Sequence, residues 1–135
     1  MENKDTGKEK RKFKRLVIKP FVKLVVNSVP NGQADIIGLS SEGVMLDISE
    51  GGMAVLLNNK IPASSLISAE FTLSYSSPLA KESYRKINVS GEVRYCTAIN
   101  AREYRAGVSF NKISDQDKSF IVQFIDWERH RLPSA

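Results

Sequence analysis

The stretch EGVMLDISEGGMAVLL, residues 42–57, carries the strongest signal for the fold. Two apolar runs, 42–49 and 51–57, lie on either side of a short polar turn, which is typical of two antiparallel strands joined by a hairpin. The turn combines an acid, a hydroxyl and two adjacent glycines: Asp47, Ser49, Gly51 and Gly52. Such a group has two interpretations, an Asx-type turn needed only for folding or a turn built to hold a ligand.

Four more segments are predicted to be strands: 16–26, 67–75, 87–95 and 103–110. The first is rich in β-branched residues, and Pro20 within it predicts an edge strand or a bend. Its apolar positions share one parity: Leu16, Ile18, Val22, Leu24 and Val26. Residues 27–35 are predicted to be a turn-rich connection, and residues 76–86 a polar loop.

The strand 87–95 alternates clearly, and four of its side chains are expected on one face, with Gly91 between them. These four are Ile87, Val89, Val93 and Tyr95. By the same alternation Arg94 is expected to point to solvent.

The pattern changes to a helical period over residues 113–132, where Phe120, Ile121, Phe124 and Ile125 share one face. Ser114 and Asp117 match a capping box. The cations Arg129, His130 and Arg131 suit the last helical turn, and Pro133 ends the helix. Trp127 is expected to be a partly buried anchor. Six short strands followed by one helix predict a barrel or a sandwich, with the helix plugging or flanking it.

Length and composition indicate one domain of 135 residues with no disulfide, because Cys96 is the single cysteine. Cys96 is expected to be a small apolar side chain on a strand, in a protein of a reducing compartment. No apolar run approaches the length of a membrane span, and the charged N-terminus lacks the apolar region of a signal peptide. A soluble, cytoplasmic protein is therefore expected.

The positive charge is concentrated at the N-terminus. Residues 1–15 hold seven bases and three acids, which gives +4 of the total net charge of +5. Residues 1–9 have almost no apolar content and are expected to be disordered in the free protein. Such a basic arm attracts phosphates, nucleic acid or an acidic surface, although a tail that only maintains solubility is the alternative.

The residues give no sign of a catalytic centre. His130 is the single histidine and is expected to be a capping cation, and one Cys with one His cannot form a Cys/His metal cluster. Asp115 and Asp117 fall in the first helical turn, where acids are expected from the helix dipole. Phosphate-binding and dinucleotide-binding glycine motifs are absent from the sequence. We therefore expect a binding protein with no cofactor and no metal, and not an enzyme.

Two motifs remain, R-x-x-x-R at Arg11 and Arg15, and D-x-S-x-x-G at Asp47, Ser49 and Gly52. The segments RKFKR, DISEGGM, GEVRY and YRAGVSF, followed by a terminal helix, resemble a PilZ domain over residues 10–127. The resemblance implies a mainly β fold, a six-stranded antiparallel β-barrel with a C-terminal α-helix. It also implies a receptor or effector for cyclic di-GMP, a bacterial second messenger, that binds through these two motifs. The chain then divides into an arm (1–9), the barrel domain with its helix (10–131) and a tail (132–135).

The residue chemistry suits that ligand. Arginine presents a planar, permanently charged fork for phosphate oxygens and for the outer edge of guanine, and Lys10 adds charge. Asp47 can accept from the pairing edge of guanine, and Ser49 can donate to a phosphate or orient Asp47. Gly51 and Gly52 are expected to allow positive φ and close approach of backbone N–H groups to an anion. Tyr95 stands where many PilZ domains carry a tryptophan, and it can stack on guanine or pack in the core.

The expected mechanism is that the arm through Arg15 is mobile and folds onto the barrel when the ligand bridges the two motifs. A separate downstream protein would then recognise the changed surface, and a monomer is the default expectation. Two alternatives remain. A nucleic-acid-binding barrel is less favoured, because such barrels need exposed aromatics on their strands, and most aromatics here fall on the apolar parity or in the helix. A PilZ scaffold that binds no nucleotide is disfavoured by the intact motifs.

Overall fold

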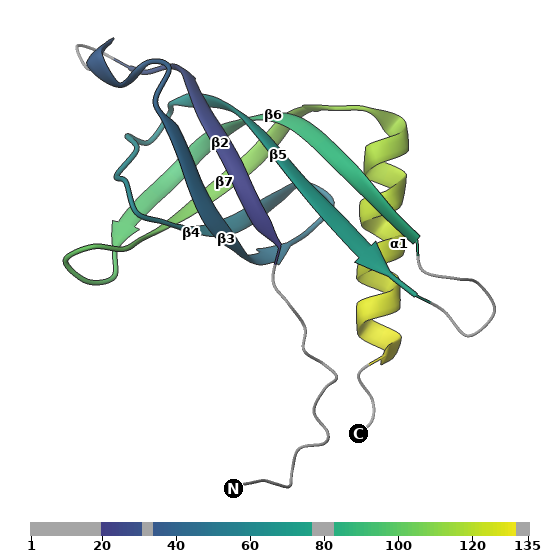
Figure 1. The fold of residues 1–135 in the computed structure, drawn as a ribbon. Coiled ribbons are helices and arrows are strands. Elements are labelled where there is room, and N and C mark those ends of the chain that lie inside the picture. Colours follow the sequence, from purple (N-terminus) through teal and green to yellow (C-terminus); the bar gives the residue numbers. More distant parts are fainter. Residues whose placement is uncertain (1–19, 31–33, 77–82, 132–135) are drawn as a thin grey trace, which may run out of the picture.

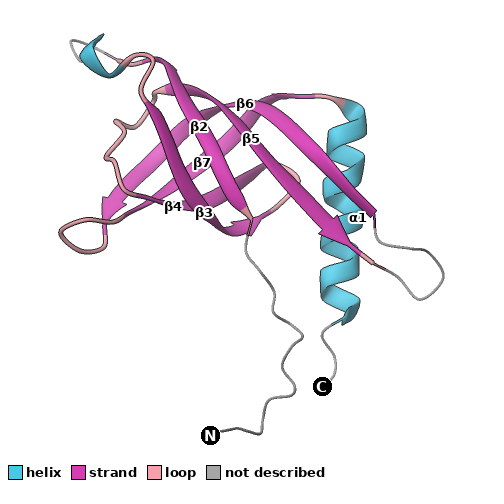
Figure 2. Ribbon diagram, viewed as in Figure 1, coloured by secondary structure: helices cyan, strands magenta, loops and turns pink. Residues whose placement is uncertain are grey.

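The computed structural model describes residues 20–30, 34–76 and 83–131. Six antiparallel strands form a closed barrel in the order β2-β3-β4-β7-β6-β5, with one long helix beside it (Figures 1 and 2). The elements are β2 (Phe21–Ser28), the short 3-10 helix η2 (Ala34–Ile36), β3 (Ser40–Ile48), β4 (Gly52–Leu57), β5 (Leu66–Tyr75), β6 (Ser83–Ala98), β7 (Tyr104–Ile113) and α1 (Asp115–Arg131). The predicted six-stranded barrel with a C-terminal helix is confirmed.

Strand β2 closes the barrel, because it pairs with β3 on one side and with β5 on the other. Val22, for example, lies opposite Gly43 of β3 and Phe71 of β5. The prediction of an edge strand was therefore wrong. Pro20 precedes β2 and disturbs neither ladder, since only its carbonyl is used, accepting a hydrogen bond from the Met45 N–H at 2.9 Å. The predicted positions before Pro20 lie outside the described residues.

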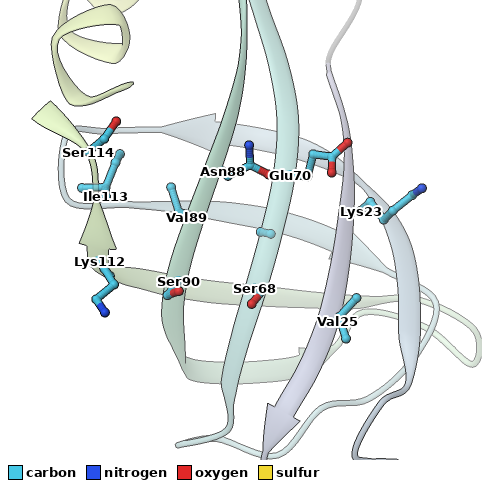
Figure 3. A pocket seen from close by; sticks show the side chains of 11 residues that line it. Lys23, Val25, Ser68, Glu70, Asn88, Val89, Ser90, Lys112, Ile113 and Ser114 are labelled. Atoms are coloured by element: carbon cyan, nitrogen blue, oxygen red, sulfur yellow. The ribbon is translucent and has the colours of Figure 1, made fainter. Parts of the chain in front are cut away.

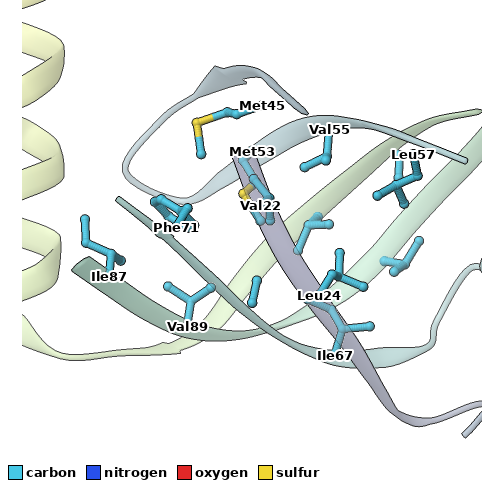
Figure 4. Packing of buried hydrophobic residues seen from close by; sticks show 14 of the residues in the cluster. Val22, Leu24, Met45, Met53, Val55, Leu57, Ile67, Phe71, Ile87 and Val89 are labelled. Carbon is cyan, nitrogen blue, oxygen red and sulfur yellow. The ribbon is translucent and has the colours of Figure 1, made fainter. Parts of the chain in front are cut away.

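The barrel interior holds the core, because alternate residues of every strand point inward and are apolar (Figure 4). One helical residue, Ile121, completes this cluster and is fully buried. The inward residues labelled in Figure 4 are Val22, Leu24, Met45, Met53, Val55, Leu57, Ile67, Phe71, Ile87 and Val89. Leu16 and Ile18, predicted on the same face, lie outside the described residues.

Strand β6 begins four residues earlier than predicted. Ser83 to Lys86 pair with β5 in register, with Ser83 opposite Tyr75 and Lys86 opposite Thr72. Their polarity predicted a loop, but this end of the strand is held by backbone pairing and by ion pairs, such as Lys86 Nζ to Glu70 Oε2 at 2.9 Å. The loop prediction was therefore wrong for 83–86, and residues 77–82 lie outside the described residues.

A β-bulge at Arg94 reverses the side-chain alternation of β6. Val93 lies opposite Val108, and Tyr95 lies opposite the very next residue of β7, Gly107, so Arg94 is the extra residue. Val93 is buried, whereas Tyr95 is 41% exposed. The prediction that Tyr95 shares the face of Ile87, Val89 and Val93 was therefore wrong. Arg94 points to solvent, as predicted.

Beyond the bulge, Cys96 returns to the interior side of β6. It is half-buried against the core, and its Sγ accepts a hydrogen bond from the Ile61 N–H at 3.5 Å. This placement confirms the prediction of a small apolar side chain on a strand.

Helix α1 is capped by Ser114, whose Oγ accepts from the Asp117 N–H at 3.1 Å. The reciprocal half of the predicted capping box is replaced by a tertiary contact. Asp117 is buried, with its side chain 10% exposed, and its carboxylate binds Arg85 Nε at 2.6 Å and the Asn88 N–H at 3.4 Å. Asp117 therefore joins the helix start to β6, a role beyond the dipole effect predicted for it.

The helix flanks the barrel and packs beside β5 and β6 (Figure 1). Trp127 is half-buried, as predicted, with its ring 5.8 Å from Tyr75 and 6.1 Å from Phe124. Near the helix end, the His130 ring nitrogen lies 2.8 Å from the Asp126 carbonyl oxygen, in line with its predicted capping role. No helix in the described part of the chain has the length and apolar character needed to cross a membrane.

The packing of α1 predicts a difference between two neighbouring substitutions. Ile121→Ala removes a fully buried side chain and should lower the free energy of unfolding by about 2–5 kcal/mol. Val122→Ala, at a position 43% exposed, is the matched control and should cost less than about 1 kcal/mol. Urea unfolding of the three proteins measures both values. Equal losses would contradict the assignment of Ile121 to the barrel core.

Candidate ligand-binding site

The turn between β3 and β4 is closed by Ser49. The Ser49 N–H donates to the Gly52 carbonyl at 2.8 Å, its hydroxyl donates to the same oxygen at 3.3 Å, and the hydroxyl accepts from the Gly51 N–H at 3.3 Å. Ser49 therefore has the folding role that the sequence left open for the Asp47–Ser49 pair. Asp47 lies before the turn, within β3, and its side chain takes no part in these bonds.

The two glycines of the turn have different requirements. A Cβ atom at Gly52 would collide with the backbone carbonyl of Val108, whereas nothing lies within 4 Å of a Cβ at Gly51. The sequence permits positive φ at these two glycines, but neither adopts a left-handed φ. Gly52 is required by the close approach of β7. The Gly51 carbonyl anchors the turn to β7 by accepting from the Phe110 N–H at 2.8 Å.

A second β-bulge places Asp47 on the outside of the barrel. Met45 lies opposite Val55, and Asp47 lies opposite the adjacent residue Ala54, so Leu46 is the extra residue of β3. The Asp47 side chain is 67% exposed.

Asp47 is one end of a lateral row across four strands. It lies opposite Ala54 of β4, which lies opposite Gly107 of β7, which lies opposite Tyr95 of β6. Laterally paired residues share a face of the sheet, and the neighbours of the row in β4 and β7 point into the core, namely Met53, Val55, Ala106 and Val108. We call these four residues the outer row.

The two middle members of the outer row are small, and the Tyr95 ring lies against one of them. A Cβ added at Gly107 would collide with the Tyr95 ring, so the absence of a side chain there lets the ring lie close to the strand. Ala54 and Gly107 thus form a low floor between a carboxylate at one end and an aromatic ring at the other. A planar base can stack on such a ring, and the acid at the other end can accept hydrogen bonds from the edge of a base.

Arg105 joins the two ends of the outer row. Its Nη2 lies 3.5 Å from Asp47 Oδ2. A hydrogen bond with Tyr95 is the main cause that raises the pKa of Arg105, and the charge of Asp47 adds to it. Neither sequence motif includes Arg105. Arg105 lies two residues before Gly107 and so has the same outer face of the strand. Its partner Asp47 could not be identified without knowing that β3 and β7 lie on the two sides of β4.

The predicted basic residues Lys10, Arg11 and Arg15 lie outside the described residues. The described chain begins at Pro20, whose carbonyl is hydrogen-bonded to the Met45 N–H. The N-terminal segment therefore joins the barrel two residues from Asp47 along β3.

A separate groove of about 390 Å3 lies on a different wall of the barrel (Figure 3). Lys23 and Lys112 stand on its two sides, and polar side chains such as Ser68 and Ser90 alternate with apolar ones such as Val89 along its lining. Glu70 at its rim is bonded to Lys86, and that hydrogen bond lowers the pKa of Glu70. The groove includes none of the residues that the sequence motifs select.

Comparison with known proteins now bears on these motifs. The profile of the PilZ domain matches residues 9–127. The chain belongs to the PilZ domain family. The family is one of cyclic di-GMP receptor and effector domains rather than of enzymes.

Among solved structures, this PilZ domain is similar to the inhibitor of motility MotI/DgrA of Bacillus subtilis, with a TM-score of 0.65 and 14% sequence identity. The alignment covers 87% of this chain and 50% of MotI/DgrA, so the chain spans about half the length of that protein. At this identity the likeness shows the shared fold. No curated protein matches the sequence at a significant level.

The two glycines of the PilZ turn give a matched pair of substitutions. Gly52→Ala forces its Cβ against the Val108 carbonyl and should lower the free energy of unfolding by about 1–3 kcal/mol. Gly51→Ala meets open space and should change it by no more than about 0.5 kcal/mol. Denaturant unfolding distinguishes the two, and equal stability of both variants would show that β7 does not press on the turn.

Proposed function

We propose that this PilZ domain is a cyclic di-GMP receptor that holds its ligand at the outer row and at the Ser49–Gly52 turn. The observation that carries the proposal is the place where the N-terminal segment joins the barrel, beside Met45 and two residues from Asp47. This position supports the proposal that the R-x-x-x-R motif meets the D-x-S-x-x-G motif on one wall of the barrel.

The distances are adequate for the two motifs to meet. Arg15 is five residues before Pro20, and an extended segment of that length spans about 17 Å. The outer row covers three inter-strand spacings, about 14 Å. An extended segment of this length therefore lets Arg15 reach the Asp47 end and the middle of the row, and an extended chain would put Arg11, four residues earlier, on the same face as Arg15.

Each end of the outer row suits one part of the ligand. The Asp47 carboxylate accepts from the N–H groups on the pairing edge of guanine, which arginine and lysine cannot do. The Tyr95 ring offers a face for a guanine base to stack on. Arg11 and Arg15, with Lys10, supply the positive charge for the two phosphates and the forks that bind guanine bidentately. Gly51 leaves open space where the ligand approaches the turn.

Signalling follows from ordering of the arm. Ligand binding draws residues through Arg15 onto the barrel, and charge-assisted hydrogen bonds offset the entropy lost. The ordered arm changes the surface beside β3, and a separate protein partner recognises that surface.

The location and the oligomeric state follow from the proposed ligand. A nucleotide second messenger is met in the bacterial cytoplasm, where we place this receptor, acting as a monomer. Within the chain we assign residues 1–9 to the arm, 10–131 to the barrel domain and 132–135 to a tail.

Isothermal titration with cyclic di-GMP tests the assignment directly. Wild-type protein should bind saturably, and Arg15→Ala should weaken binding about 10- to 100-fold, because a charge-assisted bond contributes about 1.5–3 kcal/mol. Arg94→Ala is the matched control, since Arg94 points to solvent and pairs with Glu92 at 3.6 Å. Wild-type protein that takes up no ligand at high micromolar concentration would reject the proposed function.

Hydrogen exchange tests the ordering of the arm. Amides of residues 8–16 should exchange more slowly when cyclic di-GMP is added, because they become part of a bonded segment. Residues of the β6–β7 connection, 99–103, serve as an internal reference that should not change. Equal exchange of residues 8–16 with and without ligand would show that binding does not order the arm.

A nucleic-acid-binding barrel is the second candidate, and one observation favours it. Aromatic side chains are exposed on strands at Phe21, Tyr84 and Tyr95, more than the sequence predicted. Phe21 and Tyr84, however, lie on β2 and β6 away from the outer row. Binding of a single-stranded oligonucleotide that is salt-dependent and insensitive to Asp47→Ala would support this candidate. Loss of cyclic di-GMP binding in Asp47→Ala would support the receptor.

A further inference from the structure

We propose that the Arg105 guanidinium pairs with Asp47 in the ligand-free protein and changes its partner to a phosphate of the ligand when cyclic di-GMP binds. The inference rests on the proposed function and extends it to a residue outside the two sequence motifs. It gives the receptor a third guanidinium, supplied by the barrel and not by the arm.

The contacts of Arg105 place it across the site. It lies on β7 two residues before Gly107, on the same outer face, and opposite Leu56 of β4. From there its guanidinium reaches Asp47 on β3, with Nη2 3.5 Å from Oδ2, and Tyr95 on β6 is the main cause of the raised pKa of Arg105. The side chain is thus paired with one end of the outer row and is influenced by the other.

The floor on which a base would lie is covered by other side chains. Ala54 belongs to the outer face, and yet it is only 5% exposed. Gly107 is also buried, beneath the Tyr95 ring. A base that lies on this floor must therefore displace the side chains above it, and a base that takes the Asp47 oxygen paired with Arg105 must displace the guanidinium.

The Asp47–Arg105 pair is suited to being displaced. Its two side chains are 67% and 42% exposed, and their closest atoms are 3.5 Å apart, a weak ion pair in water. Guanine N–H donors compete with the guanidinium for the same carboxylate oxygens. The pair therefore holds Asp47 in position without holding it tightly.

The displaced guanidinium needs a new anion. Arginine stays charged at every physiological pH, so the displaced side chain keeps its need for an anionic partner. The incoming ligand carries two phosphates, which offer oxygens in the geometry that a guanidinium fork binds bidentately. Arg105 thus exchanges a carboxylate partner for a phosphate partner.

The test is titration of the full chain with cyclic di-GMP, using Arg105→Ala, Arg105→Lys and the control Arg94→Ala. Arg105→Ala should weaken binding about 10-fold or more, because a contact with a phosphate is lost. Arg105→Lys, which keeps the charge and loses the fork, should recover part of that loss. Arg94→Ala should bind as the wild type does. Thermal unfolding of each variant shows that the barrel is intact.

A second measurement separates transfer from a purely structural role. The Nε–Hε NMR signal of Arg105, assigned by its loss in Arg105→Lys, should move when ligand is added to the wild type. It should also move in ligand-free Asp47→Asn, because the carboxylate partner is then absent. A signal that stays in place in both experiments would overturn the transfer.

The outcomes distinguish this inference from the proposed function. Wild-type binding that is lost in Arg15→Ala and unchanged in Arg105→Ala would overturn the role of Arg105 and leave the receptor assignment standing. No binding by the wild type would overturn both. Weakening that is equal in Arg105→Ala and Arg105→Lys, with an unmoved signal, would reduce Arg105 to a structural side chain and overturn the transfer.

Discussion

The pairing of β2 with both β3 and β5 is the constraint on which the rest of the structure depends. A closed barrel leaves no free edge along the paired stretches of the described strands, and it forces neighbouring strands to curve and approach closely. Glycine supplies the room at the closest approaches. A Cβ at Gly43, Gly52 or Gly91 would collide with side-chain or backbone atoms of an adjacent strand. The extra residues Leu46 and Arg94 supply the curvature.

The candidate site is a product of those two bulges. Leu46 precedes Asp47 and Arg94 precedes Tyr95, and in each strand the bulge brings the following side chain to the outer face. The acid and the ring thereby become the ends of one row, with Ala54 and Gly107 between them. The site is thus assembled from two pairs of consecutive strands, β3 with β4 and β6 with β7, that are distant from each other in sequence. Its chemistry is set by register as much as by residue type.

The sequence predicted the fold well where periodicity was strong. The strands around the DISEGGM turn, the alternation of β5 and the helical face that includes Ile121 were all found from spacing. The first residues of β6 were missed because their outward side chains are polar and their strand character comes from pairing with β5. Tyr95 was assigned to the wrong face because a single extra residue reverses alternation, and no composition signal marks Arg94 as extra.

The candidate site could be predicted only in part, for the same physical reason. Asp47, Ser49 and Gly52 were found as a local motif, although Ser49 closes the turn and Gly52 meets a steric requirement instead of a conformational one. Arg105 could not be found, because its partners lie on other strands. Lys10, Arg11 and Arg15 remain predictions from the motif and its chemistry.

The bulge at Arg94 also affects how related chains should be compared. In most strands a substitution changes one side chain, and insertions and deletions between related sequences are confined to loops. Here the deletion of Arg94 would restore a regular ladder and leave the tyrosine opposite Gly107, because Val93 already lies opposite Val108. The aromatic surface can therefore be kept by chains of two different lengths in this strand, one with the extra residue and one without it. Alignments of such domains compare this wall correctly only when a gap of one residue is allowed between the positions of Val93 and Tyr95.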